Sequence, residues 1–361
     1  MNGLNYYGVF SAGQGYSGSS EQYAIALNKL TRVSFMNLNP NVPDINISDE
    51  GRKVMKNPFK LEEVGISYGF PNQFTSMQHN KFRVGFTMFE TTKLPNGVND
   101  WVGEVGDPAK AINETCDLLF VPSQDSRLTF MRHGVTVPIE VIHNGVHPTT
   151  FPYMERNRKP GHKFTFLIMG TLTIRKNSGA VISAFIDLFK NSDDVRLIVK
   201  TQSGTHGHLE FDKSLGDITI IDQVYDHDQM TALMEEADCF VFPTHGEGFG
   251  MPPIEAMATG LPTIIAANSG MLEYMDARYN LPVKSFEMER AVRYPKKWGD
   301  VGYWWKPDWE DLRTKMLWVY SHQAEAREMG KRASEWVREE YNYDKIAQQM
   351  LDAIEKHRAA L

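Results

Sequence analysis

Hydrophobic and polar positions follow two periods in the second half of the chain. Short apolar runs such as KFTFLIMG (163–170), VRLIVKT (195–201) and CFVFPT (239–244) are typical of strands that are buried on both faces. Between these runs lie segments with helical spacing, which are SGAVISAFIDLFKN (178–191), DQMTALMEEA (228–237) and PPIEAMATG (252–260). Because short buried strands alternate with helices, this half predicts a doubly wound α/β domain with a parallel sheet.

The first half has the same alternation in a weaker form, and it predicts a second domain of the same class. Its expected strands include LNYYGVF (4–10), RVSFMNL (32–38), FRVGFTMF (82–89) and CDLLFVPS (116–123). The segment SSEQYAIALNKL (19–30) is an expected helix. The stretch from Asn39 to Lys60 has no clear period and is interpreted as an inserted loop region.

Proline and basic residues mark a linker at HPTTFPYMERNRKPGHK (147–163), which has little periodicity. We therefore expect an N-terminal domain over residues 1–150 and a C-terminal domain over residues 151–340. The last segment, 341–361, is expected to be a helix. A length of 361 residues agrees with two domains of roughly 150 residues each.

Composition limits the classes of partner molecule, the role of the cysteines and the cellular location that we expect. The chain has 38 basic and 45 acidic residues, and its formal net charge of −7 gives no overall attraction to a polyanion. Cys116 and Cys239 each lie in an apolar run without the spacing of a metal site, and they are interpreted as reduced core residues. We find no signal-peptide pattern and no apolar stretch of ~20 residues. We therefore expect a cytoplasmic protein, in the host cytoplasm if viral, without integral membrane association.

The segment FPTHGEGFGMPPIEAMATGLP (242–262) places two glutamates, Glu247 and Glu255, around a glycine-rich turn that follows a strand. Glycines let backbone amides approach a ligand closely, and the start of a helix favours an anion. Carboxylates accept hydrogen bonds from hydroxyl groups, so a glutamate on the loop and one on the helix suit a ligand with hydroxyls and a phosphate. The alternative is structural, with Glu255 as a charge near a helix terminus after a tight turn.

With its continuation to Met275, this segment resembles the E-x7-E region of retaining GT-B glycosyltransferases of family 4. VYDHDQMTALMEEADCFVFP, FTMFETTKLP and CDLLFVPSQDSRLTFMRHGVTVPIEVIHNGV are similar to other parts of that family in the same order, so the resemblance runs from about Arg83 to Met275. It implies two Rossmann-like domains that face each other across a cleft, with the C-terminal helix packing back on the N-terminal domain. Residues 1–150 are expected to form the acceptor-side domain and residues 151–340 the domain that binds the nucleotide sugar. It also implies a retaining hexosyl- or pentosyltransferase.

The resemblance implies roles for individual residues. Glu255 is expected to bind the ribose of a sugar nucleotide, and Glu247 is expected to lie against the donor sugar near the reacting carbon. The amides of Gly248, Phe249 and Gly250 are expected to contact the sugar or the diphosphate, and the backbone around Val224 and Tyr225 is expected to contact the base.

Two basic residues follow the first strand of the C-terminal domain in GTLTIRKN (170–177). A nucleoside diphosphate gains negative charge as it leaves, so a metal-free enzyme needs fixed cations there, and Arg175 and Lys176 are predicted to supply them. The family often carries an arginine directly after the strand glycine, where this chain has Thr171, so whether Arg175 replaces it stays open. No Asp-x-Asp pair follows a strand, and a metal held by carboxylates is not expected.

The N-terminal domain contributes two further candidates. SAGQGYSGSS matches a G-x-G-x-x-G pattern at Gly13, Gly15 and Gly18, but the acidic residue expected ~20 positions later is missing. The resemblance implies instead that this loop closes over the donor phosphates, with Gly15 as its closest approach. Glu90, expected at the end of a strand that faces the cleft, is a candidate to orient or deprotonate the acceptor hydroxyl. The alternative is a carboxylate that caps the next turn.

The predicted function is transfer of a sugar from a UDP- or GDP-sugar to a saccharide or glycan, without a cofactor. Glycosylation of hydroxymethylated bases in DNA, as by some viral GT-B enzymes, is an alternative that would use two basic stretches, 154–163 and 289–298. An NAD(P)-dependent oxidoreductase is favoured only by the glycines of the first domain. A sugar-binding protein without activity is disfavoured because the chain keeps both cations and both glutamates.

Overall fold

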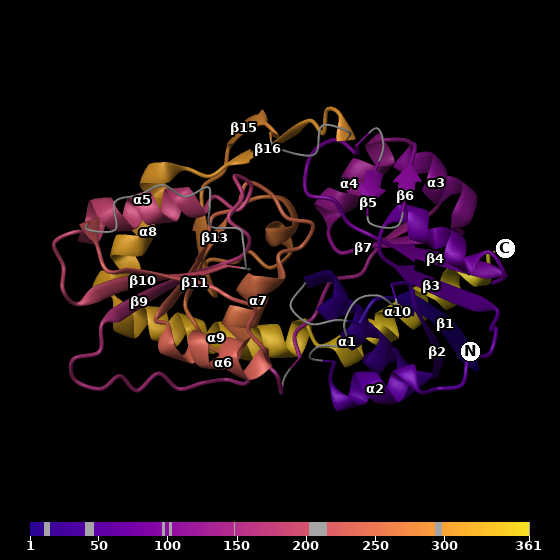
Figure 1. The fold of residues 1–361 in the computed structure, drawn as a ribbon, viewed down its shortest axis with the longest axis horizontal. Coiled ribbons are helices and arrows are strands. Elements are labelled where there is room, and N and C mark those ends of the chain that lie inside the picture. Colours follow the sequence, from indigo (N-terminus) through magenta and orange to yellow (C-terminus); the bar gives the residue numbers. More distant parts are fainter. Residues whose placement is uncertain are drawn as a thin grey trace. The chain divides into compact units, whose positions relative to one another are not determined.

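Two units divide the chain in the computed structural model, which describes residues 1–10, 15–39, 47–95, 98–100, 103–147, 149–201, 215–292 and 298–360. Unit 1 consists of Met1–Gly145, Arg293–Gly302 and Tyr341–Leu361, and unit 2 consists of Val146–Val292 and Tyr303–Glu340. Each unit has its own six-stranded parallel sheet with helices on both faces (Figure 1). The predicted fold class is therefore confirmed. The acceptor and donor roles given to the two domains stay predictions.

The sheet of unit 1 has the order β2-β1-β3-β4-β7-β8, and every neighbouring pair is parallel. Its strands are β1 (Gly3–Gly8), β2 (Arg32–Asn37), β3 (Val64–Tyr68), β4 (Phe82–Phe86), β7 (Leu118–Val121) and β8 (Ile139–Val141). The strands β1, β3 and β7 are buried at every position, as expected for apolar runs in a sheet that is covered twice. A separate antiparallel pair is formed by β5 (Val98–Asp100) and β6 (Gly103–Val105).

The helices of unit 1 cover its sheet in two groups (Figure 1). One group is α1 (Gly15–Leu30), α2 (Asp49–Met55) and α10 (Tyr343–Arg358), and the other is α3 (Pro108–Thr115) and α4 (Gln124–Arg132), with the 3-10 helix η1 (Pro71–Met77) against α3. The C-terminal helix α10 packs on α1 and buries Ile346, Met350 and Ile354 in the same core as Tyr23. The expected return of the last helix to the N-terminal domain is confirmed.

One expectation for unit 1 is wrong, because part of the stretch from Asn39 to Lys60 is the helix α2. The hydroxyl of Ser48 caps this helix by accepting a hydrogen bond from the N–H of Gly51 at 3.0 Å. The N–H of Ser48 donates to the buried carboxylate of Glu21 at 2.9 Å. A helix of 7 residues is too short to be stable alone, so contacts with distant residues stabilise it. No periodic pattern in the sequence predicts it.

The sheet of unit 2 has the order β11-β10-β9-β12-β13-β14 and is also parallel throughout. Its strands are β9 (Phe164–Met169), β10 (Val195–Thr201), β11 (Ile218–Asp222), β12 (Cys239–Phe242), β13 (Thr263–Ala266) and β14 (Leu281–Val283). Counted within the unit, the first strand lies beside the fourth, which is the order of doubly wound nucleotide-binding sheets. The strands predicted at 163–170, 195–201 and 239–244 are confirmed.

The helices α5 (Ser178–Phe189) and α8 (Trp309–Ser321) lie against each other on one face of this sheet (Figure 1). The other face carries α6 (His227–Glu236), α7 (Met251–Ala258) and α9 (Gln323–Glu340), and a 3-10 helix, η4 (Ser269–Glu273), follows β13. Helix α5 buries Val181, Phe185 and Phe189, as its spacing predicts. The core of unit 2 lies between the sheet and these apolar helix faces.

An antiparallel hairpin of β15 (Glu287–Arg290) and β16 (Tyr303–Lys306) completes unit 2. It does not belong to either six-stranded sheet. The sequence pattern did not predict it. Its anchor is Trp304, which is only 1% exposed although it lies on a two-stranded element. A lone hairpin is marginally stable in water, so this buried indole ties it to the rest of the unit.

Candidate active site

Two loops of unit 2 leave the sheet at the carboxyl ends of neighbouring strands. The strands β9 and β12 are hydrogen-bonded partners. Later strands of the chain are added outward on either side of this pair, so the direction in which the sheet grows reverses between them. The loop after β9 spans residues 170–177, and the loop after β12 spans residues 243–250. Ligands of open α/β sheets bind at this edge, so the two loops define the candidate site.

The two loops are tied to each other by hydrogen bonds in both directions. Asn177 has a left-handed backbone, with φ of 56°, and its side-chain amide donates to the carbonyl of Pro243 at 3.0 Å. The N–H of His245 donates to the carbonyl of Arg175 at 2.8 Å. In return, Nη1 of Arg175 donates to the carbonyl of Gly246 at 2.7 Å. These bonds fix the two loops side by side.

The centre of the site is Glu247. Its Oε1 lies 2.8 Å from Nη1 of Arg175 and 2.8 Å from Nζ of Lys176, and the side chain is buried. Burial by itself would raise the pKa of Glu247, but the two cations outweigh it and hold the pKa below its usual range. The ammonium of Lys176 also lies 4.9 Å from the centre of the Phe242 ring. Three predicted residues thus come together as a charged carboxylate between two cations.

The turn after Glu247 packs closely on the segment that follows β13. A Cβ on Gly270 would lie 2.4 Å from the carbonyl oxygen of Gly248, so this approach of two backbones needs glycine. Gly250 precedes α7 with φ of 89°, and its carbonyl accepts a hydrogen bond from the hydroxyl of Tyr274 at 2.8 Å. Phe249 is buried with its ring 5.4 Å from that of Tyr274, so its side chain anchors the turn in the core.

Ser269 supports Glu247 from a backbone conformation that is uncommon outside glycine, with φ of 46°. Its hydroxyl accepts a hydrogen bond from the N–H of Glu247 at 2.9 Å and donates to Oδ1 of Asn268 at 2.9 Å. Asn268 donates in turn to the carbonyl of Thr244 at 3.0 Å. Sequence reasoning missed Ser269 and Asn268, although a polar Asn-Ser-Gly segment after a buried strand was a signal for them. Strained residues of this kind cluster at functional sites.

Glu255 lies on α7, the helix that follows the turn at Gly248–Gly250. Its side chain is half-buried, and within the described part of the chain it makes no hydrogen bond or ion pair. Burial without a compensating charge raises the pKa of Glu255 to about 7. The two glutamates therefore differ, because Glu247 is held ionised by two cations while burial favours the protonated form of Glu255.

The predicted base contacts, Val224 and Tyr225, lie between β11 and α6, at the same edge of the sheet and two strands away from β9. Val224 is 61% exposed. The ring of Tyr225 has its centre 4.6 Å from Nζ of the buried Lys200, which also donates to the carbonyl of Thr201 at 2.9 Å. These contacts fix the aromatic ring and leave Val224 open to a ligand.

The remaining candidates belong to unit 1. Gly15 is the exposed first residue of α1, whereas Gly13 falls outside the described residues. The prediction that Glu90 ends a strand is wrong, because the pairing of β4 stops at Phe86 and Glu90 lies in a bend four residues later. Burial raises the pKa of Tyr16 to about 12, and the negative charge of Glu90 adds to this effect, so the two side chains are near neighbours.

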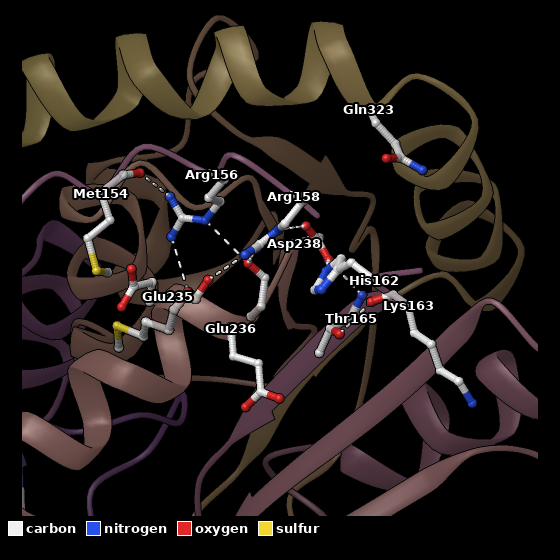
Figure 2. A network of polar contacts seen from close by, with 12 residues as sticks. Met154, Arg156, Arg158, His162, Lys163, Thr165, Glu235, Glu236, Asp238 and Gln323 are labelled. Carbon is white, nitrogen blue, oxygen red and sulfur yellow. Dashed lines mark hydrogen bonds and ion pairs between the residues drawn. The ribbon is translucent and has the colours of Figure 1, made fainter. Parts of the chain in front are cut away.

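Both arginines of segment 154–163 bond to other residues of unit 2. Figure 2 shows the guanidinium groups of Arg156 and Arg158 turned toward the end of α6 and the start of β12. Arg156 is buried, and burial lowers its pKa to about 10. Arg158 lies 2.6 Å from Asp238. Residues 293–297 of the other basic stretch, 289–298, fall outside the described residues, and the alternative of a DNA acceptor gains no support.

Two further expectations concern the cysteines and membrane spans. Cys116 and Cys239 are free and buried, and burial raises the pKa of both thiols, to about 12 for Cys116. The interpretation as reduced core residues is confirmed. Among the helices that the structure describes, none is both long and apolar enough to cross a bilayer.

The sequence pattern of a known family covers this site. A family profile described as glycosyl transferases group 1 matches residues 150–336, which is more than half of the chain. The chain belongs to the group 1 glycosyl transferases. Both loops of the site, α7 and the loop before α6 lie inside the matched region of this glycosyltransferase. Membership favours a transferase over the oxidoreductase alternative.

Relatives and solved structures agree with this family. A protein assigned as glycosyltransferase 45 of a Sulfolobus islandicus filamentous virus is 23% identical over 337 residues, 85% of this chain and 91% of the viral protein. Sucrose-phosphate synthase of Thermosynechococcus elongatus shares the fold with a TM-score of 0.70 and 17% identity over 100% of both chains. The Anabaena protein HepE in complex with UDP-glucose follows with a TM-score of 0.65 and 12% identity, again over both whole chains. Bacterial relatives such as glycogen synthase of Mycobacterium tuberculosis are matched over only 33% of their length.

Proposed function

We propose that this glycosyltransferase is a retaining enzyme of family 4 that moves a sugar from a nucleoside-diphosphate sugar to a hydroxyl group of a saccharide or glycan. The observation that carries the proposal is the buried carboxylate of Glu247, which lies 2.8 Å from cations of both Arg175 and Lys176. Cations beside a carboxylate at the switch point of a sheet suit a ligand in which a diphosphate adjoins a ring with several hydroxyls.

Arg175 and Lys176 are the proposed clamp for the diphosphate. As the glycosidic bond breaks, negative charge gathers on the leaving phosphate, and cations that are already in place stabilise it without reorganising. Arginine has five N–H donors, so Arg175 can keep its bond to Gly246 and still bind a phosphate oxygen. Because these two side chains supply positive charge at the leaving group, we propose that transfer needs no metal ion.

Glu247 is the proposed contact of the donor sugar. The two cations keep its pKa low, so at neutral pH it is ionised and accepts hydrogen bonds from sugar hydroxyls. It also places a negative charge near the reacting carbon, which becomes positive as the leaving group departs. In a same-face route Glu247 positions the sugar, and in a covalent route it is the nucleophile; both give retention, which the E-x7-E resemblance supports.

The nucleoside is assigned to the neighbouring elements of unit 2. Glu255, whose side chain makes no hydrogen bond or ion pair within the described chain, is proposed to accept hydrogen bonds from the ribose hydroxyls. The amides around Gly248, Phe249 and Gly250 are proposed to face the sugar or the diphosphate, and the exposed backbone at Val224 and Tyr225 the base. A helix that begins beside the phosphates adds its N-terminal partial charge.

Unit 1 is proposed to receive the acceptor. Glu90 is the candidate that orients or deprotonates the acceptor hydroxyl, and its bend after β4 places it at the carboxyl edge of that sheet. Gly15, at the start of α1, is the proposed closest approach of unit 1 to the donor phosphates. The absence of a side chain there leaves room for a phosphate group.

We propose a UDP-sugar as the first donor to test, since HepE has the same fold and was solved with UDP-glucose. Relatives named glycogen synthase and O-antigen chain mannosyltransferase support a saccharide or glycan acceptor. GDP-sugars are the second choice. The configuration of the product, read by NMR coupling constants at the new linkage, tests retention.

Thermal shift with UDP, GDP, ADP, CDP and dTDP and their sugars, in EDTA, tests the donor class. A ligand at ~100 times its dissociation constant stabilises by about 2.7 kcal/mol, which moves the melting temperature by several degrees. We expect a shift with one nucleoside diphosphate that is lost in Glu255→Ala and Arg175→Ala and kept in Glu328→Ala, which changes an exposed residue of α9. No shift with any of the five would contradict the proposed function.

A further inference from the structure

We propose that His245 is a positioning residue for the transfer reaction, which locks the loop that carries Glu247 onto the β15–β16 hairpin. The proposal rests on the proposed function, because in that function the position of Glu247 relative to the donor sugar determines the rate. His245 itself does not need to touch the substrate. Its role is to hold two residues of backbone next to the reacting group in one conformation.

The backbone of His245 is bonded on both sides. Its N–H donates to the carbonyl of Arg175 at 2.8 Å, and its carbonyl accepts from the N–H of Trp305 at 2.9 Å. One residue therefore joins the loop after β9, the loop after β12 and the strand β16. The next two residues are fixed as well, since Gly246 accepts from Arg175 at 2.7 Å and the N–H of Glu247 donates at 2.9 Å to a serine hydroxyl.

The imidazole adds a second bond to the same place on the hairpin. Nδ1 of His245 lies 2.8 Å from the carbonyl oxygen of Trp305. A carbonyl only accepts, so Nδ1 carries the proton, and this bond fixes the tautomer. Burial lowers the pKa of His245, while the Trp305 carbonyl and Glu289 oppose the change and Lys306 adds to it, so the ring is neutral at pH 7.

The face of the imidazole is held by an indole. The rings of His245 and Trp304 are stacked, with centres 4.9 Å apart and planes 29° apart. Nε1 of Trp304 donates to Oε1 of Glu289 at 3.0 Å across the hairpin, so the indole cannot rotate away without losing that bond. His245 is thus held by an edge contact with the Trp305 carbonyl and a face contact with the Trp304 ring, and both come from β16.

The expected effect of this arrangement is on turnover more than on nucleotide affinity. The proposed nucleoside contacts lie on α7 and before α6, and a change in the His245 side chain removes none of the groups that bind the nucleoside. A small displacement of a reacting group can cost about a hundredfold in rate. Loosening the loop should therefore lower kcat and leave the affinity for UDP almost unchanged.

Three substitutions separate the two contacts. Asparagine places an amide nitrogen close to the position of Nδ1 without a ring, phenylalanine keeps a ring without the donor, and alanine removes both. His322 supplies a matched control, because its Nδ1 lies 3.0 Å from the carbonyl of Trp318 and its ring stacks on that indole, with centres 5.0 Å apart. This second pair is at the end of α8, outside the loops of the site. His322→Ala removes the same two kinds of contact elsewhere.

Initial rates, UDP titration with its stoichiometry, and amide hydrogen exchange at residues 245 and 247 are measured on each variant. We expect kcat to fall about tenfold in His245→Phe and about a hundredfold in His245→Ala, with UDP affinity within about twofold, and a loss of about threefold or less in His245→Asn. Faster exchange at both amides should accompany the loss in kcat. His322→Ala should match the unsubstituted chain in all three measurements.

Two results would overturn the positioning role. One is unchanged exchange at residues 245 and 247 in His245→Ala, which needs no activity to be measured. The other is a fall in rate that only follows a fall in UDP-binding stoichiometry, which would indicate misfolding. If no variant and not even the unsubstituted chain binds a nucleoside diphosphate, the proposed function fails, and the exchange data still decide whether His245 fixes the loop.

Discussion

Replacing Glu255 by glutamine is expected to stabilise the chain at alkaline pH and to leave its stability unchanged at acid pH. Burial raises the pKa of this carboxyl from 4.5 to about 7. At 1.36 kcal/mol for each pKa unit, the difference corresponds to up to about 3 kcal/mol between the protonated and the ionised side chain. Glutamine keeps the shape and removes the charge.

The sign follows from proton binding. Between pH 4.5 and 7 the folded chain keeps the proton of Glu255 that the unfolded chain has released, so stability falls as pH rises through this window. Above it the full cost of the buried charge is present. At pH 8 the Glu255→Gln variant should therefore unfold at a temperature about 4 °C higher than the unsubstituted chain, and at pH 4.5 the two should differ little.

The assay is thermal unfolding by circular dichroism at both pH values, without nucleotide, with Glu328→Gln as a control on an exposed side of α9. Comparing variants at the same pH cancels the titration of all other groups. An equal difference at both pH values, or a lower melting temperature of the variant at pH 8, would refute the account of Glu255 as a buried charge without a partner. The same variant should lose the stabilisation by UDP, which would mark Glu255 as a residue kept for binding at a cost in stability.

Three other predictions concern contacts described above. Gly270→Ala has no room for its Cβ, so it should destabilise the chain by about 2 kcal/mol or more and weaken UDP binding. Gly18→Ala, in open space on α1, should be neutral or stabilise the chain by about 0.5–1 kcal/mol. Urea unfolding and UDP titration check both variants. Asp238→Asn leaves the guanidinium of Arg158 without its counter-charge and should lower stability by about 3 kcal/mol, seen as a lower urea midpoint with an unchanged slope. Cys116 and Cys239 should react with a thiol reagent only under denaturing conditions, and rapid labelling of the folded chain would contradict their burial.

The sequence alone predicts those elements whose own pattern of hydrophobic residues defines them. Helix α5 has apolar residues at helical spacing, and the parallel strands of unit 2 are continuous apolar runs. Helix α2 was missed because its stability comes from the contact of Ser48 with Glu21, which lies 27 positions earlier. The hairpin was missed because its anchor, Trp304, is buried by residues that are distant in sequence.

The candidate site divides in the same way. Arg175, Lys176 and Glu247 lie in loops that follow strands, so sequence order alone placed them at one edge of the sheet. Sequence order could not predict the contact between these side chains, because the ion pair of Lys176 with Glu247, 71 positions apart, depends on the pairing of β9 with β12. His245 was passed over because its partner, Trp305, is 60 positions away. Local patterns thus identify chemistry, and tertiary pairing decides which groups act together.

The position of α10 sets an order of events during synthesis. Unit 1 combines Met1–Gly145 with Tyr341–Leu361, and all of unit 2 lies between these two segments, interrupted by Arg293–Gly302, which belongs to unit 1. At roughly 5–20 residues per second, a ribosome needs about 10 to 40 s to pass from the first part to the helix. During that time α1 lacks the apolar cover that Ile346, Met350 and Ile354 supply. The unit that is synthesised first is therefore the last to be completed, and its nascent form offers an exposed helix face to chaperones.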